Sequence, residues 1–469
     1  MKTAAQVDGF YQKLPVPLQN VACSYYGWRD SRVRYGPEFH RRLAGLLDSD
    51  WWPDADIAAY QDDQVARLVR RAYDEVPYYR DVMKSLHLRP GDIKGRADLQ
   101  KLPVLDKETV RRAGGRLRSS AVDPRTLLPR HTSGTTGKSL SFSVTRKSIG
   151  FQWAVWWRHR QRFGLALDDW HVNFTGKLVV PPAQDAPPYW RWNLPMRQGL
   201  VNMHHLTIDK VADVVRFLDR RLYAYYSGYP SVIHALAMAA DEAGLSLTNP
   251  PRVVVTGAEN MLGPQRRDIA SLTGAVLTDQ YGFSEGCGNA SQCEEHVYHE
   301  DYEFGAIECV DPVPLGDGRV RGRIVCTGFA SPEAPFIRYD TGDLGVWAAD
   351  PEPCPCGRRS SILLGIDGRI DQYVLTPEGR RIMRFDYVFK ETPNVQECQV
   401  VQNELGGIVL RVVRRAAYGV RDERLVAAEI ARWVSPALEV EFEYVDEIAR
   451  TSAGKFRAVV SRLDKSGSA

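Results

Sequence analysis

A loop of glycine and hydroxyl residues carries the strongest chemical signal in the sequence. Small residues let the backbone approach an anion closely, and N–H groups, hydroxyls and an ammonium can all donate to phosphate oxygens. The loop reads His131, Thr132, Ser133, Gly134, Thr135, Thr136, Gly137, Lys138 and Ser139. A Walker A loop needs glycine five residues before Gly137, where this chain has Thr132. A P-loop NTPase is therefore disfavoured, and a plain glycine-rich hairpin turn is the structural alternative.

Two short pairs of metal-ligand residues lie far apart in the chain. Cys293 and His299 have the spacing C-x5-H, and Cys354 and Cys356 form a C-x-C hook on a turn. Two such pairs are the arrangement of a structural zinc site, although the spacing departs from common zinc-finger templates. His296 is an alternative fourth ligand. Free reduced cysteines on loops are the alternative to a metal site.

Strand and helix signals alternate through the middle of the chain, which must position these groups. Apolar residues at positions i, i+3, i+4 and i+7 predict an amphipathic helix over 211–222. Strands are predicted at 223–227, 252–256 and 275–279, with helices over 231–243 and up to about 272. This alternation predicts a parallel α/β sheet, whose ligands bind outside the carboxyl ends of its strands. Residues 257–259 and 280–282 follow two of these strands, so we expect both segments to line one pocket.

The two ends of the chain have other patterns. Residues 57–86 are predicted to be helical, and residues 1–55 to be irregular or helical. From residue 371 the pattern gives strands at 397–402 and 406–415, a helix at 421–434 and a strand at 440–448. These elements are enough for a small α+β domain. We therefore expect an N-terminal domain over 1–370 and a C-terminal domain over 371–469.

Composition excludes several classes of protein. The chain has 469 residues, 44% hydrophobic and 25% charged, which is typical of globular proteins of more than one domain. A net charge of +3 gives no field that argues for nucleic acid or an anionic membrane. There is no apolar run of membrane-spanning length and no signal-peptide pattern, and eight cysteines are too few for a disulfide scaffold. A cytoplasmic enzyme is the expectation.

Five segments, taken in order, resemble the core motifs of the adenylate-forming superfamily. They are the glycine and hydroxyl loop and the segments 279–285 (DQYGFSE), 338–343 (RYDTGD), 368–371 (GRID) and 450–457 (RTSAGKFR). Segments 99–111 (LQKLPVLDKETVR) and 354–360 (CPCGRRS) are similar to the phenylacetate–CoA ligase and CapK-like branch, some of whose members carry comparable cysteine and histidine pairs. The resemblance implies a large multi-layer α/β adenylation domain with a small mobile α+β domain. It also implies a two-step reaction, in which an acid and ATP give acyl-AMP and pyrophosphate, and an acceptor then takes the acyl group.

The resemblance also implies roles for individual residues. The β- and γ-phosphates would be held by Ser133, Gly134, Thr135, Thr136, Gly137 and Lys138. The nucleotide would be surrounded by Gly257, Ala258, Glu259, Tyr281, Gly282 and Ser284, with the Tyr281 ring against adenine. Asp343 would bind the ribose hydroxyls, and Arg369 would bind the ribose or a phosphate. Glu285 is similar to the Mg²⁺ carboxylate, Asp371 to the hinge residue and Lys455 to the catalytic lysine. Each of these residues also has a structural alternative, such as a core tyrosine or a turn aspartate.

The acid and the acceptor are less well specified. The family often places a residue near the substrate carboxylate where this chain has His204 and His205. Six tryptophans between 153 and 192 suit an aromatic acid, although aromatic residues at helical spacing are more often core. CoA is favoured as the acceptor over a carrier protein or a small-molecule amine or hydroxyl. A catalytically inactive adenylate fold that serves as a binding module is the alternative from a different class, and the oligomeric state is left open.

Overall fold

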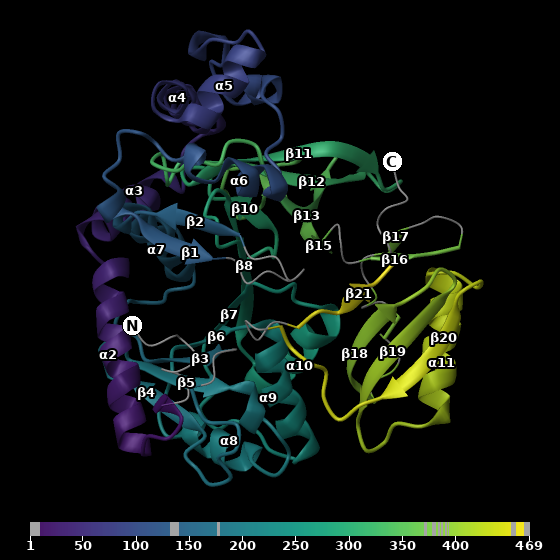
Figure 1. Ribbon diagram of the computed structural model, residues 1–469. Helices are drawn as coiled ribbons and strands as arrows, with labels where there is room; N and C mark the ends of the chain where they lie inside the picture. The colour runs from purple at the N-terminus through teal and green to yellow at the C-terminus, as the bar shows by residue number, and fades with distance from the viewer. Residues whose placement is uncertain are drawn as a thin grey trace.

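A nine-stranded mixed sheet forms the centre of the molecule (Figure 1). The structure is a computed structural model that describes residues 10–131, 140–175, 179–369, 373–377, 381–382, 385, 388–389, 392, 394–451 and 456–463. Across the sheet the strands are β14 (Ile362–Leu363), β10 (Tyr298–Glu300), β9 (Asn289–Gln292), β8 (Val276–Gly282), β7 (Val253–Gly257), β6 (Tyr225–Gly228), β3 (His171–Thr175), β5 (Gln198–Asn202) and β4 (Trp190–Asn193). Strands β5, β3, β6, β7 and β8 are parallel, which confirms the parallel arrangement predicted for β6, β7 and β8; β3 and β5 were not predicted, and antiparallel strands extend the sheet on both sides.

The two faces of this sheet are covered by different helices. Alternate strand residues such as Val172, Tyr226 and Val254 join one core cluster with α8 (Val211–Asp219), α9 (Pro230–Glu242) and α10 (Gly263–Thr273). The intervening residues face α7 (Arg146–Arg162), where His159 hydrogen-bonds Thr278 at 2.8 Å. Because strand side chains alternate between faces, Asn173 and Ser227 also lie on the α7 side.

The described N-terminal residues 10–131 form five α-helices. They are α2 (Val16–Arg34), α3 (Pro37–Ser49), α4 (Asp54–Glu75), α5 (Pro77–Ser85) and α6 (Lys107–Ala113). The predicted helix over 57–86 is thus two helices, because the chain breaks at Val76, the residue before Pro77. Helix α2 packs against the edge strand β4, along one side of the molecule (Figure 1).

A second sheet carries two of the predicted site residues, Asp343 and Arg369. Its strands are β11 (Gly305–Pro314), β12 (Arg319–Gly328), β13 (Tyr339–Ala348) and β15 (Gly365–Arg369), all antiparallel. In the register of β13 and β15, Asp343 lies opposite Arg369. The motifs 338–343 and 368–371 therefore meet on one ladder. The hairpin of β1 (Leu128–His131) and β2 (Ser141–Val144) flanks the residues 132–139.

The C-terminal residues form a separate small sheet (Figure 1). Its order is β20 (Glu439–Tyr444), β19 (Gly407–Arg414), β18 (Val395–Gln402) and β21 (Val459–Ser461), with α11 (Val420–Trp433) packed on it and a core of its own. A short pair, β16 (Val374–Leu375) and β17 (Arg381–Ile382), precedes it. The fold-class prediction is confirmed. The predicted boundary at 370/371 falls outside the described residues and stays a prediction.

Within the described part of the chain, no helix combines the length and the apolar character needed to cross a membrane.

Candidate active site

One large cavity lies at the carboxyl ends of the parallel strands, between the main sheet and the C-terminal sheet. Its volume is about 1290 Å³, and residues from β7, β8, β13, α7 and the segment 456–459 line it. Gly257 closes β7, and Ala258 then turns the chain with φ = +67°. One expectation needs correction: Gln280, Tyr281 and Gly282 do not follow the strand predicted at 275–279 but belong to it. They continue β8 because β9 pairs with them.

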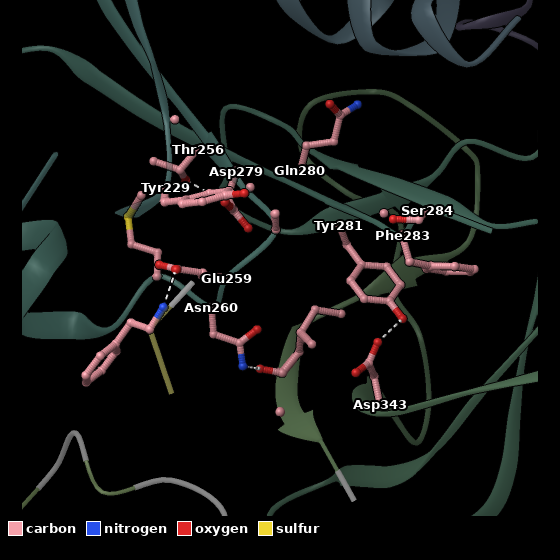
Figure 2. Close-up of a pocket in the computed structure, with 18 of the residues that line it drawn as sticks. Tyr229, Thr256, Glu259, Asn260, Asp279, Gln280, Tyr281, Phe283, Ser284 and Asp343 are labelled. Carbon is pink, nitrogen blue, oxygen red and sulfur yellow. Dashed lines mark hydrogen bonds between the residues drawn. The ribbon is translucent and has the colours of Figure 1, made fainter. Parts of the chain in front are cut away.

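Tyr281 and Asp343 meet inside this cavity (Figure 2). The Tyr281 hydroxyl donates to Oδ2 of Asp343 at 2.8 Å and lies 3.3 Å from Oγ1 of Thr341. Burial raises the pKa of Tyr281 well above its ordinary value, and the Asp343 carboxylate adds to this effect. The phenol is therefore neutral, and it orients the carboxylate for which the family resemblance implies ribose binding.

Glu285 is the second buried carboxylate of the cavity. It follows β8 and is 6% exposed, and its Oε1 accepts a hydrogen bond of 2.6 Å from the Tyr339 hydroxyl. Ser284, the preceding residue, also lines the cavity (Figure 2). A carboxylate oriented in this way beside an open space suits a hard cation such as Mg²⁺.

Glu259 connects the main sheet to the C-terminal part of the chain. Its Oε1 accepts a 2.7 Å hydrogen bond from the backbone N–H of Phe456, and its Oε2 lies 3.3 Å from the N–H of Ser231. Burial raises the pKa of Glu259, and these hydrogen bonds oppose that increase. Phe456 directly follows Lys455 in the sequence. The carboxylate is thus a fixed contact for the segment that carries the predicted catalytic lysine.

Several predicted residues lie outside the described part of the chain. They are the loop residues Ser133, Gly134, Thr135, Thr136, Gly137 and Lys138, together with Asp371 and Lys455. For Arg369 the structure describes only the backbone, which lies opposite Asp343.

The structure does not bring His204 and His205 to the cavity, which corrects their assignment as substrate residues. His204 is exposed on a short 3₁₀ turn. His205 is fully buried and its ring stacks on that of Tyr189. Its Nδ1 lies 3.2 Å from Oδ1 of Asn202, and its Nε2 lies 3.1 Å from the carbonyl oxygen of Gln184. Both ring nitrogens of His205 are thus occupied by protein groups, which is the pattern of a core histidine.

Only part of the aromatic segment reaches the cavity. Trp153 and Trp156 line it, whereas Trp157 is buried in a hydrophobic cluster with α3. Trp170, Trp190 and Trp192 pack with the core on the opposite face of the sheet. Most of these aromatic residues therefore belong to the hydrophobic core, which was the structural alternative to a substrate pocket.

A row of residues on α7 was not singled out from the sequence. Ser148, Gln152, Trp156 and Arg160 recur at intervals of four, and all line the cavity. Four-residue spacing places side chains on one face of a helix, so the spacing itself is the signal that would have found them. Asn173 and Ser227 line the cavity from the sheet.

The cysteine and histidine pairs converge about an edge of the main sheet. The ligand atoms of Cys293, His299, Cys354 and Cys356 all lie within 4.8 Å of one another. The two sulfurs of Cys293 and Cys354 are 3.8 Å apart, and Sγ of Cys356 is 3.3 Å from Nε2 of His299. A tetrahedral Zn²⁺ with Zn–S distances of about 2.3 Å separates two sulfurs by roughly 3.8 Å, whereas a disulfide needs about 2.05 Å.

The environment of this group also suits a metal. Burial lowers the pKa of His299 to about 4, and the nearby Arg162 and Arg358 contribute, so the imidazole is neutral at pH 7. Its Nδ1 lies 3.4 Å from Oγ of Ser360, which leaves Nε2 facing the sulfurs. His296 is not part of the four-residue group.

Comparison with known proteins gives consistent results. The family of CapK C-terminal domains matches residues 374–462. Protein CapK of Staphylococcus aureus is 22% identical over 461 residues, which is 97% of this chain and 99% of that protein. The phenylacetate-coenzyme A ligase of Thermus thermophilus is 27% identical over 341 residues, 69% of this chain and 72% of the relative.

A solved structure supports the fold. The 2-hydroxyisobutyryl-CoA ligase in the postadenylation state, in complex with R3-HIB-AMP, has a TM-score of 0.68 at 20% identity and covers 88% of this chain and 91% of its own. The chain is therefore similar over most of its length to CapK and to phenylacetate–CoA ligases, and its fold is that of an adenylate-forming CoA ligase. The resemblance that the five motifs indicate is confirmed.

Proposed function

We propose that the protein activates a carboxylic acid with ATP, forming an acyl-adenylate and pyrophosphate, and then transfers the acyl group to the thiol of CoA. The observation that carries this proposal is the convergence of three groups on one cavity: Asp343 with Tyr281, Glu285 with Tyr339, and Glu259 with the backbone beside Lys455.

The chemistry explains why these residue types are needed. A carboxylate is a weak nucleophile toward a polyanionic phosphate, so the site must neutralise charge and align the reactants. Asp343, held by Tyr281, would accept hydrogen bonds from the ribose hydroxyls. The hydroxyls and ammonium of the loop 132–139 would bind the outer phosphates. Mg²⁺ held by Glu285 would supply further neutralisation of the phosphate charge.

The lysine completes the first half-reaction in this scheme. Lys455 would place its ammonium between the attacking carboxylate and the α-phosphate, and the contact of Phe456 with Glu259 would hold its segment there. The carboxylate then displaces pyrophosphate. Asp371 would serve as the hinge that lets the small domain reorient before the acceptor attacks.

The names of the relatives support CoA as the acceptor and an aromatic acid as one substrate class. Four of the curated relatives are named phenylacetate-coenzyme A ligases, at 27% to 29% identity. A carrier protein or a small-molecule amine or hydroxyl is the alternative acceptor. We further propose that Cys293, His299, Cys354 and Cys356 hold a structural Zn²⁺.

Acid-dependent exchange of pyrophosphate into ATP tests the first half-reaction. A panel of aryl, arylacetic, amino, fatty and dicarboxylic acids should give exchange with at least one member, and Glu285→Gln should abolish it. Exchange that fails with every acid, in protein that binds ATP, would contradict the proposal and favour the inactive binding module.

A half-reaction comparison tests Lys455 and the acceptor. We expect Lys455→Ala to lose adenylation by several orders of magnitude while it still converts supplied acyl-AMP and CoA to the thioester. Equal loss of both steps would remove Lys455 from its assigned role. If the protein consumed acyl-AMP with an amine but not with CoA, the acceptor would be the amine and not CoA.

A further inference from the structure

Helix α7 forms one wall of the cavity, and Arg160 lies at the far end of this wall. The contacts of its guanidinium with described residues are all with neutral groups. The Arg160 guanidinium donates to the carbonyl oxygen of Trp156 at 2.9 Å and lies 5.6 Å from the centre of the Trp157 ring. It also neighbours Tyr225: burial raises the pKa of this phenol, and the guanidinium opposes the increase. Among the described residues, no carboxylate forms an ion pair with Arg160.

A second arginine on the same wall shows the contrast. Arg34, at the end of α2, lies 4.3 Å from the centre of the Trp153 ring and pairs with Asp30 at 3.0 Å. The charge of Arg34 is therefore balanced within the protein. Arg160 lines the same cavity with its charge unbalanced by any described acid.

The wall opposite α7 is the face of the main sheet, and this wall also carries polar side chains. Asn173 of β3 and Ser227 of β6 line the cavity, and the Asn173 amide donates to Oγ and O of Ser227 at 3.0 and 3.3 Å. A pocket for a purely hydrocarbon acid would have apolar walls, because polar groups that lose water without a partner destabilise a complex. These walls instead suit a ligand with oxygen atoms at its inner end.

The row on α7 gives the direction of this pocket. The Trp157 ring lies 6.5 Å from the ring of Tyr225, the first residue of β6, so the C-terminal part of α7 lies at the amino ends of the strands. Arg160 belongs to this part and lies three turns from Ser148, a rise of about 18 Å. Arginine side chains on a helix lean toward its N-terminus, which here is the end nearer the nucleotide-binding residues. A ligand whose reacting carboxylate is at that end would reach Arg160 with its other end.

We propose that the acid activated here carries a second anionic group, a carboxylate or comparable oxyanion, which Arg160 binds at the end remote from the reacting carboxylate. The guanidinium is suited to this because its fork of donors binds a carboxylate through two parallel hydrogen bonds. The inference rests on the proposed adenylation function and specifies the class of acid that the site selects.

Matched acids test the charge preference. Pyrophosphate exchange is measured with hexanedioate against hexanoate, and with para-carboxyphenylacetate against phenylacetate and its para-carboxamide and para-aminomethyl derivatives. We expect kcat/KM to be at least about tenfold higher for the dianionic member of a pair and lowest for the aminomethyl acid. Equal or lower values for both dianions than for their neutral parents would overturn the inference while leaving adenylation intact. Absence of exchange with every acid would overturn the proposed function and this inference with it.

Variants of the same helix assign the preference to Arg160. Arg160→Met should lower kcat/KM for the dianionic acid by about tenfold or more, mainly through KM, and change the neutral parent by less than about threefold. Arg160→Lys should restore part of the preference. Arg146→Met is the matched control, because Arg146 is an exposed residue of α7 outside the cavity. Equal losses for all acids in Arg160→Met, with Arg160→Lys no better, would identify a structural role and overturn the inference.

Discussion

Phenol groups orient the two carboxylates that face the nucleotide end of the cavity. Tyr281 donates to Asp343 at 2.8 Å, and Tyr339 donates to Glu285 at 2.6 Å. A neutral donor orients a carboxylate without cancelling its charge, whereas an arginine would compete with the cation or ribose that the carboxylate is expected to bind. Prealigned groups need no reorganisation when the reaction occurs, which is how such sites stabilise a transition state.

Removing the Tyr281 hydroxyl should weaken nucleotide binding without unfolding the protein. Hydrogen bonds to charged groups contribute about 1.5–3 kcal/mol, so Tyr281→Phe should raise KM for ATP by about tenfold or more in pyrophosphate exchange. Tyr79→Phe is the matched control, because Tyr79 donates to the Pro335 carbonyl outside the cavity. It should lower the melting temperature and leave KM unchanged. Equal KM values in the two variants would contradict a role for Tyr281 in orienting Asp343.

Single elements were predicted well where one physical rule dominates. The parallel strands β6, β7 and β8 follow from short β-branched or aromatic runs alternating with helices, and each lies within a few residues of its expected position. The end of β8 was missed because its last three residues are paired by β9, a contact between strands that local pattern does not contain. The role of Arg160 was also missed, because it too depends on contacts in space that the local sequence pattern does not contain. Its significance depends on the absence of an ion-paired acid among the described residues, whereas His205 attracted attention by its type and proved to be core.

The loop after β7 should control docking of the lysine-bearing segment. Glu259 accepts the N–H of Phe456 at 2.7 Å, so Glu259→Ala should remove a contact on which adenylation depends but thioester formation from supplied acyl-AMP does not. We expect exchange to fall by about ten- to a hundredfold and the second half-reaction by less than about threefold, with Glu259→Gln intermediate because its amide oxygen still accepts.

A second contact between the same two parts of the chain provides the control for Glu259. Arg415 of the C-terminal part pairs with the exposed Asp241 of α9 at 3.0 Å, and exposed ion pairs contribute little. Asp241→Asn should therefore leave both half-reactions within about twofold. If Glu259→Ala slowed both half-reactions equally, the carboxylate would act on nucleotide binding rather than on docking.

At the scale of the whole molecule, a buried group of charges joins elements distant in sequence. Asp50, at the end of α3, contacts Arg162 of α7 and accepts from Arg358 at 2.9 Å. Arg158, which is 1% exposed, pairs with Asp301 at 2.6 Å and with Glu303 at 2.7 Å. Because breaking a buried pair leaves an uncompensated charge, this group stabilises one arrangement of α3, α7 and the main sheet.

The same group should make stability depend on pH. Burial alone would raise the pKa of Asp50, but the guanidinium groups of Arg162, Arg158 and Arg358 hold it well below its ordinary value. A depressed folded-state pKa means that the stabilisation is complete above the unfolded pKa of about 3.9 and is lost as pH falls below it. Asp50→Asn should lose about 3–5 kcal/mol at pH 7 and show a smaller further loss on acidification than the unmodified protein. Thermal melts from pH 7 to pH 3 measure the loss at pH 7 and the further loss on acidification. If stability fell equally with pH in Asp50→Asn and in the unmodified protein, Asp50 would not be the source of the pH dependence.

The cysteine and histidine group should add a second tie between distant parts of the chain. Cys293 directly follows β9 and His299 belongs to β10, whereas Cys354 and Cys356 belong to the segment that leads to β14 and β15. A bound Zn²⁺ would therefore hold the segment following Glu285 against the segment preceding Arg369, and binding a ligand to the folded state alone raises stability. We expect about one zinc per chain by elemental analysis, loss of that zinc in Cys354→Ser, and a melting temperature lowered by several degrees after chelation. Cys309→Ser is the control, because this free thiol of β11 lies outside the group, and it should keep its zinc. Protein prepared with zinc that retains none, and whose melting temperature chelators do not change, would show that these four residues are reduced thiols and an imidazole packed together without a metal.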